Sequence, residues 1–152
     1  MSLSAFDIAA SGMAVHRAEM DVIAQNIANA GTTRAGGAPY RDRQVVAEPI
    51  EQDSFASIFD DAVSMDGDGD LPEGVRIAGI VESDAPPQYR LDPGNPFAIA
   101  QGPRRGFVAE TDVDPIEQMV SLVSTGRAYD ADVAALQAAK QMDVEAIGVD
   151  GQ

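Results

Sequence analysis

The residue types that most often do chemistry are scarce in this sequence. His16 is the only histidine, and the chain contains no cysteine. It also has no Gly-x-Ser-x-Gly segment that would present a nucleophilic serine. A lone imidazole inside a helical stripe is more often a packing residue or a polar interruption than a general base. We therefore predict no catalytic residues.

The best candidate for a metal site lies in an acidic segment. Aspartates alternate with glycines over residues 66–70, and alternate carboxylates can converge on a hard cation such as calcium. The match fails further on, because Leu71 stands where the loop needs glycine and Ile77 where it needs a bidentate glutamate. We predict a solvated acidic loop and no metal. An acidic metal-binding module stays open as an alternative.

Other cofactors and two classes of partner are disfavoured. Gly31, Gly36 and Gly37 neither follow a clear strand nor open a helix, so we expect no dinucleotide cofactor. Twenty-five acidic residues against ten basic ones give a formal charge of −15, which disfavours nucleic acid and anionic membranes as partners. No apolar run is long enough to cross a bilayer, and the start lacks the pattern of a secretory signal. Composition alone would place the chain in the cytoplasm.

The elements that could position side chains begin with a helix expected over residues 4–30. Apolar side chains recur there at seven-residue steps, with a companion position three residues further on, which is typical of a helix that packs along its length against other helices. Gly31 is a plausible end of this helix. The stripe consists of Phe6, Met13, Met20 and Ile27, with Ala9, Ile23 and Ala30 as companions.

A second long helix is expected over residues 115–147. Asp114 can cap it, Pro115 suits its first position, and Glu117 completes a capping box. Its apolar positions step by threes and fours with a mean near 3.5, which predicts coiled-coil packing. These positions include Ile116, Met119, Val123, Gly126, Tyr129, Val133 and Leu136, with Lys140 interrupting the stripe before Val144 and Ile147.

The segment between the helices has a different character. Eight prolines within residues 32–112 oppose any long helix. Short runs at 44–47, 75–82 and 88–91 predict strands, and residues 92–96 predict a turn. Residues 51–74 are strongly acidic and contain no Lys or Arg, so we expect a loop there with at most a short helix near 55–63.

These patterns define the expected fold. It is mainly α with a small β-rich middle, and its long N- and C-terminal helices pair as a coiled coil. The division is residues 1–31 for the first helix, 32–112 for the middle and 113–152 for the second helix. The two apolar stripes are wider than so small a middle can cover, which indicates an interaction surface or an obligate oligomer.

The two ends of the chain resemble the signatures of bacterial flagellar rod, hook and hook-associated proteins. The resemblance lies in residues 6–13 and 22–30 at one end, and in 113–120, 127–133 and 140–142 at the other. The run Asn26, Ile27, Ala28, Asn29, Ala30 is the most specific part. Pro39, Tyr40 and Arg41, followed by two valines, look like the proximal-rod type within this family.

The resemblance implies a function that the residue patterns alone do not give. Members of the family are exported through the flagellar type III apparatus without a cleaved signal, and they assemble into a rod that crosses the periplasm and transmits torque from motor to hook. Their terminal helices pair as a coiled coil in the inner layer of a tube. Expected partners are other rod proteins, copies of this chain, the proteins that join the rod to the MS ring, and the export apparatus.

Residue roles follow from the same resemblance. Asn26, Ala28, Asn29 and Ala30 would shape the turn after the first helix and contact neighbouring subunits. Gly126 replaces the usual Ala or Ser, Gly31 the usual Asn or Asp, and Phe107 the common Tyr. We expect both terminal helices to be partly disordered in the free subunit and to be ordered by assembly, since an isolated heptad face in water does not offset the loss of chain entropy. Another axial protein of the same group stays open as an alternative.

Overall fold

The computed structural model describes residues 5–33, 39–50 and 74–149, with only the backbone described for 146–149. Its elements in chain order are α1 (Ala5–Asn29), β1 (Arg43–Pro49), β2 (Val75–Glu82), β3 (Gln88–Leu91), β4 (Phe107–Glu110) and α3 (Pro115–Val149). The two helices and the first three strands lie where the sequence predicts them. Strand β4 was not predicted. The predicted helix near 55–63 and the acidic loop around it fall outside the described residues.

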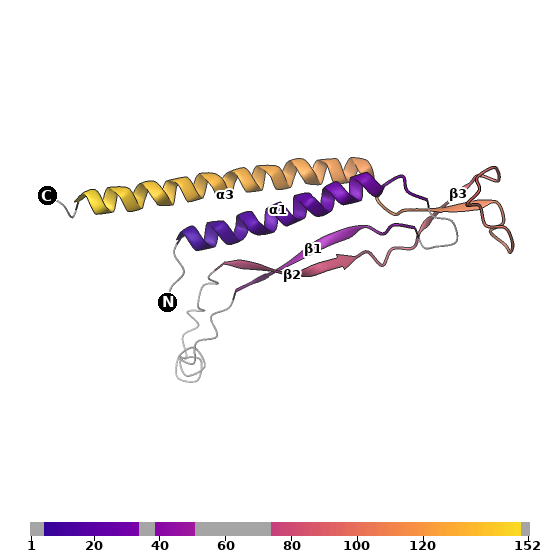
Figure 1. Ribbon diagram of the computed structural model, residues 1–152, viewed down its shortest axis with the longest axis horizontal. Coiled ribbons are helices and arrows are strands. Elements are labelled where there is room, and N and C mark those ends of the chain that lie inside the picture. The colour runs from indigo at the N-terminus through magenta and orange to yellow at the C-terminus, as the bar shows by residue number, and fades with distance from the viewer. Residues whose placement is uncertain (1–4, 34–38, 51–73, 150–152) are drawn as a thin grey trace, which may run out of the picture.

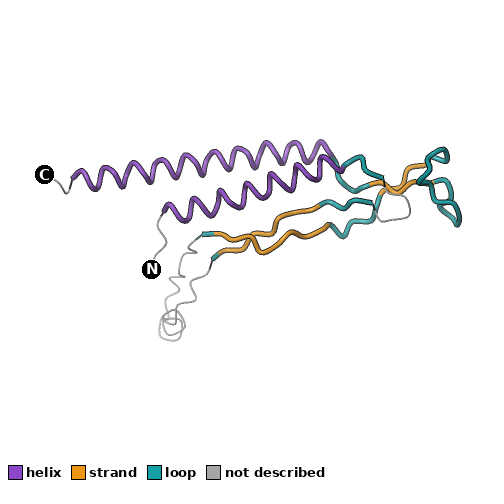
Figure 2. The backbone as a smooth tube through the Cα atoms, viewed as in Figure 1, coloured by secondary structure: helices purple, strands orange, loops and turns teal. Residues whose placement is uncertain are grey.

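The molecule is elongated, and α1 is its central layer (Figure 1). Helix α3 packs against one side of α1, and the β1–β2 ribbon packs against α1 as well, whereas neither strand of the ribbon contacts α3. The described start of α1 and the described end of α3 lie at the same end of the molecule (Figure 2). Helix α1 is therefore covered by two different partners.

The two helices run antiparallel. Asn26 near the end of α1 contacts Gln118 near the start of α3, and His16 in the middle of α1 contacts Asp132 further along α3. Asp114 caps α3, since its side chain accepts a hydrogen bond from the backbone N–H of Ile116 at 2.8 Å, as predicted. This pairing leaves the last ten or so residues of α3 beyond the described start of α1.

Two separate antiparallel sheets of two strands form the β-rich middle. In the first sheet β1 pairs with β2, with a bulge between Val46 and Ala47. In the second sheet β3 pairs with β4, and these strands contact no other helix or strand. The predicted turn at 92–96 is present, with the backbone N–H of Asn95 bonded to the carbonyl of Asp92. The β3–β4 hairpin projects from one end of the molecule, and the start of α1 and the end of α3 lie at the opposite end (Figure 1).

The apolar core is small. Among the described residues only Val15, Val22, Val108, Val113 and Ala139 are buried hydrophobics. Burial of side chains this small supplies a modest hydrophobic term. Polar contacts at the junctions between elements therefore carry an unusual share of the specificity of the fold.

Candidate functional site

Asn26 forms the centre of the main polar junction. The side chain is 1% exposed. Its oxygen accepts hydrogen bonds from the Tyr40 hydroxyl at 2.8 Å and from the backbone N–H of Arg43 at 3.1 Å. Because a backbone N–H can only donate, these contacts fix which end of the amide carries the oxygen.

The amide nitrogen of Asn26 faces three acceptors. They are a carboxylate oxygen of Asp42, the backbone carbonyl of Arg43 at 2.8 Å and the side-chain oxygen of Gln118 at 3.2 Å. Two N–H protons are thus shared among three acceptors. One side chain on α1 is therefore joined both to the segment that enters β1 and to the first turn of α3.

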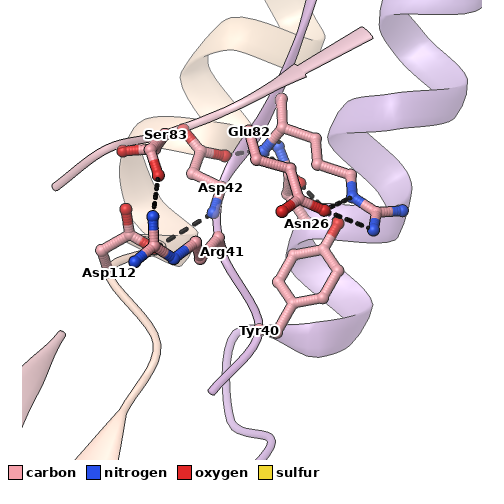
Figure 3. A network of polar contacts seen from close by, with 8 residues as sticks. Asn26, Tyr40, Arg41, Asp42, Glu82, Ser83 and Asp112 are labelled. Carbon is pink, nitrogen blue, oxygen red and sulfur yellow. Dashed lines mark hydrogen bonds and ion pairs between the residues drawn. The ribbon is translucent and has the colours of Figure 1, made fainter. Parts of the chain in front are cut away.

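Asp42 closes the junction from the other side. Its carboxylate accepts a hydrogen bond from the side-chain nitrogen of Gln118 at 3.2 Å. Its backbone N–H donates to the Asp112 carboxylate at 3.0 Å, and its carbonyl accepts from the backbone N–H of Ser83 at 2.7 Å. Figure 3 shows Asp42 between Asn26 and Asp112. We call Asn26, Tyr40, Asp42, Arg43 and Gln118 the Asn26 junction.

Charged and aromatic groups surround this junction. Arg43 donates from Nη2 and Nε to one Glu82 oxygen, at 2.7 and 3.1 Å, and its guanidinium lies 5.4 Å from the centre of the Tyr40 ring. The hydrogen bond to Glu82 raises the pKa of Arg43. Desolvation by burial raises the pKa of Tyr40, so its hydroxyl stays protonated and able to donate to Asn26. Arg41 donates to the Ser83 carbonyl at 3.1 Å (Figure 3).

A second polar cluster lies between the helices at their middle. His16 Nδ1 lies 2.9 Å from a Glu19 oxygen, and its Nε2 lies 3.7 Å from an Asp132 oxygen that has no hydrogen-bond partner among the described residues. A Cβ added at Gly12 would lie 2.8 Å from that same Asp132 oxygen. Gly12 therefore lets Asp132 of α3 approach α1, and the predicted polar interruption at His16 is an inter-helix contact.

The end of α1 differs from the prediction that Gly31 stops the helix. Gly31 has no positive φ, and it does not end the helix as a glycine cap would. Instead the carbonyl of Asn29 accepts hydrogen bonds from the backbone N–H of Thr32 at 3.0 Å and from its hydroxyl at 2.8 Å. Thr32 thus supplies two donors to a carbonyl at the end of the helix. Ala28 is exposed, whereas Asn29 and Ala30 are half-buried.

The predicted packing residues fall into two groups. The half-buried ones are Phe6, Met13, Met20, Ile23 and Ile27 on α1, and Gly126, Tyr129, Val133 and Leu136 on α3. The exposed ones are Met119 and Val123 on α3. Among the described residues nothing lies within 4 Å of a Cβ placed at Gly126, so no close neighbour in that part of the chain requires a glycine there.

The exposed group belongs to a continuous apolar groove on the first half of α3. Its apolar side chains are Ile116, Met119, Val120 and Val123, which are 73%, 54%, 66% and 57% exposed. Ser124 and Arg127 complete the lining of this groove of about 460 Å³. Nothing in the described part of the chain covers it. We call these six residues the α3 groove.

Sequence reasoning missed several residues that hold the elements together. Val15 and Val22 are buried on α1 although neither belongs to the predicted stripe. Their spacing of seven was a usable signal, but the polar residues His16 and Glu19 lie between them and obscure it. Gln118, Tyr40 and Asp42 carry no periodic signal, since their partners come from distant parts of the chain.

The described residues contain no arrangement suited to metal chemistry. No group of three or more His, Asp or Glu side chains in these residues could hold a metal ion. Within the same residues, no helix combines the length and apolar character that a bilayer crossing needs. The aspartates at 66–70 lie outside the described residues.

The comparisons with known proteins match this chain to flagellar basal-body rod proteins. Residues 6–35 match the family described as flagella basal body rod protein, and residues 104–148 match the C-terminal family of flagellar basal body rod FlgEFG proteins. The chain is 36% identical over 148 residues to the flagellar basal-body rod protein FlgC of Bacillus subtilis, covering 94% of each chain. It is 36% identical to the FlgC of Salmonella typhimurium, covering 92% of this chain and 91% of that one. The FlgC of Borreliella burgdorferi is 30% identical over 149 residues, covering 96% of this chain.

Proposed function

The chain belongs to the FlgC family of flagellar basal-body rod proteins, and from that premise we infer that it is a structural subunit of the rod. We propose that it occupies the proximal part of the rod and helps to transmit torque from motor to hook. The observation that carries the proposal is the similarity over nearly the whole length to proteins of this one kind. The elongated helix pair is a suitable shape for a filament subunit (Figure 2).

The α3 groove supports a role by assembly. Four large apolar side chains left more than half exposed on one helix face are unfavourable in water, at roughly 1.5 to 3 kcal/mol for each side chain that a neighbour could bury. We propose that neighbouring subunits cover this groove, and that Met119, Val123 and Gly126 pack between subunits. Gly126 would then allow close approach from outside the chain, because no described neighbour within the chain needs a glycine there.

We further propose that α1 and α3 form a coiled coil completed by assembly. The most deeply placed positions on α3 include Gln118, Leu122, Thr125, Tyr129, Asp132, Leu136 and Ala139, which alternate steps of four and three. A repeat of 3.5 residues is the spacing of a left-handed supercoil. The half-buried stripe of Phe6, Met13, Met20, Ile23 and Ile27 would gain further burial from neighbours, and the segments 1–31, 32–112 and 113–152 would act as separate parts of the subunit.

Partners and delivery follow from the same proposal. The partners are other rod proteins, copies of this chain and the proteins at the base of the rod, and the chain acts by packing and without catalysis. Export through the flagellar type III apparatus needs a subunit that unfolds readily. The absence of cysteine, and so of disulfides, suits that route.

Complementation tests this function. In a flagellated bacterium deleted for its own FlgC, the wild-type gene should restore swimming and the protein should be found in purified basal bodies. The double variant Met119→Gln, Val123→Gln should be secreted but fail to build rods, while the matched control Val81→Gln, an exposed valine on β2, should swim. Failure of the wild-type chain to enter basal bodies would contradict the proposal.

A further inference from the structure

The β3–β4 hairpin and its loop form a protruding tip with no partner in the described chain. Its strands contact only each other, and an isolated two-stranded hairpin is marginally stable in water. The loop is held by its own backbone hydrogen bonds, including Gly106 N–H to Ile99 and Ile99 N–H to Phe107. Gly106 has a φ of 81°, a conformation that favours glycine. The tip is therefore a defined shape, with Val108 of β4 as its buried side chain.

The surface of the tip has the composition of a binding site. Leu91 is 62% exposed, and Tyr89 on the same strand and Phe97 in the loop are also exposed. The guanidinium of Arg104 lies 4.2 Å from the centre of the Tyr89 ring. Exposed aromatic and arginine side chains grouped on one surface are the residue types that dominate protein–protein binding energy.

The charge of the tip is opposite to that of the chain. Arg90 pairs with Glu110 at 3.0 Å, but Arg104 and Arg105 pair with no carboxylate among the described residues. A chain of net charge −15 thus presents two uncompensated arginines beside exposed apolar side chains. A long anionic polymer such as a nucleic acid would be repelled by the negative charge of the rest of the chain. The two arginines therefore favour a small acidic surface on another protein as the partner.

The opposite end of the molecule displays a surface of the complementary kind. Ala139 is the last buried residue of α3 among the side chains that the structure describes, and residues 140–145 are exposed because the described part of α1 does not reach them. Ten residues of free helix extend about 15 Å. Met142 and Val144 are each 62% exposed there, next to Asp143 and Glu145. No lysine or arginine follows Lys140, so the negative end of the helix dipole is not offset by a basic side chain.

We propose that the tip binds the carboxyl end of the C-terminal helix of an adjacent rod subunit. That helix end would combine acidic and exposed apolar side chains, as residues 140–145 do in this chain. Leu91 and Phe97 supply the apolar contact, and Arg104 and Arg105 meet the carboxylates and the helix end. The inference rests on the proposed function, because it needs neighbouring subunits stacked end to end. It assigns the hairpin the role of an axial connector.

Photo-crosslinking in assembled basal bodies tests this assignment. A benzophenone amino acid is placed at Leu91 or, in a second variant, at Phe97, and the cross-linked peptides are identified by mass spectrometry. The expected product joins the tip to the C-terminal helix of a neighbouring rod subunit, at a segment rich in Asp or Glu. Cross-links to a ring protein or to another part of a rod subunit, or no cross-link from either position, would overturn the proposal.

A charge test accompanies the cross-link. Arg104→Glu with Arg105→Glu should reduce the cross-link yield at least tenfold, since two attractive contacts become repulsive. The matched control is Arg76→Glu on β2, an exposed arginine outside the tip, which should leave the yield unchanged. An equal yield in both variants would contradict the electrostatic part. If rods form normally but the cross-link goes elsewhere, only this inference fails, whereas absence of the chain from rods would defeat the proposed function itself.

Discussion

Replacing Asn26 tests how strongly one buried amide holds the helices to the strands. In Asn26→Ala the Tyr40 hydroxyl and the backbone N–H of Arg43 lose their acceptor, and Gln118 loses a donor. An unsatisfied buried group costs about 1 to 3 kcal/mol. Tyr40 and Arg43 are both half-buried, and the Tyr40 hydroxyl can turn to water, so we expect the lost contacts together to cost about 3 kcal/mol.

The variant Asn26→Asp separates hydrogen-bond polarity from packing. A carboxylate has nearly the same size and still accepts from Tyr40 and Arg43. It cannot donate, however, and it would face the Asp42 carboxylate. We expect a loss at least as large as that of Asn26→Ala at pH 7. Adding Asp42→Asn supplies an N–H group in place of the opposing charge and should restore more than half of the lost stability.

The assay is urea and thermal unfolding of the monomer followed by circular dichroism at 222 nm. A loss of 3 kcal/mol corresponds to a fall in Tm of about 6 to 12 °C for a chain of this size. Asp42→Asn alone serves as the control and should cost less than about 1 kcal/mol, because its remaining oxygen can still accept. Losses below about 0.5 kcal/mol in both Asn26 variants, or a double variant no better than Asn26→Asp, would refute the reasoning.

Three further predictions concern other sites. Gly126→Ala should raise monomer stability by about 1 kcal/mol in urea unfolding, since the added methyl meets open space and alanine favours helix, and a loss of stability would contradict this placement. Gly12→Ala should gain less stability than Gly126→Ala, because its methyl displaces the Asp132 carboxylate from His16; an equal gain would exclude that close approach. The raised pKa of Tyr40 favours the protonated phenol in the folded state, so its contribution to stability is present below pH 10 and is lost as the pH rises through the folded pKa. Absorbance at 295 nm, compared with Tyr40→Phe, should show Tyr40 ionising after free tyrosine, and ionisation at or below pH 10 would contradict its burial.

Much of the fold could be predicted because it depends on local signals. The capping of α3 by Asp114 and the spacing of its apolar positions mark that helix without reference to the rest of the chain. The turn at 92–96 is similarly local, since its proline, glycine and asparagine favour turn conformations. Strand β4 was missed although β3, of the same four-residue length, was predicted, because residues 107–110 become a strand only by pairing with β3.

The site was less predictable because its partners are far apart in sequence. Asn26 and Gln118 meet across ninety-two positions, and nothing near either residue indicates the other. The sequence resemblance marked Asn26 as important but not as a link between elements. Val15 and Val22 were missed for a related reason: α1 is covered on more than one side, so its buried positions do not form the single stripe expected of a helix with one partner.

The central claim is that this chain is a rod subunit whose exposed apolar faces are covered only by neighbours. The most direct test is a density map of basal bodies purified from the complemented strain, at a resolution that separates helices. We expect α1 and α3 in the inner layer of the rod, with the α3 groove against a helix of another subunit. A map that places the chain in the rod with the α3 groove facing solvent, or that lacks the chain, would contradict the account.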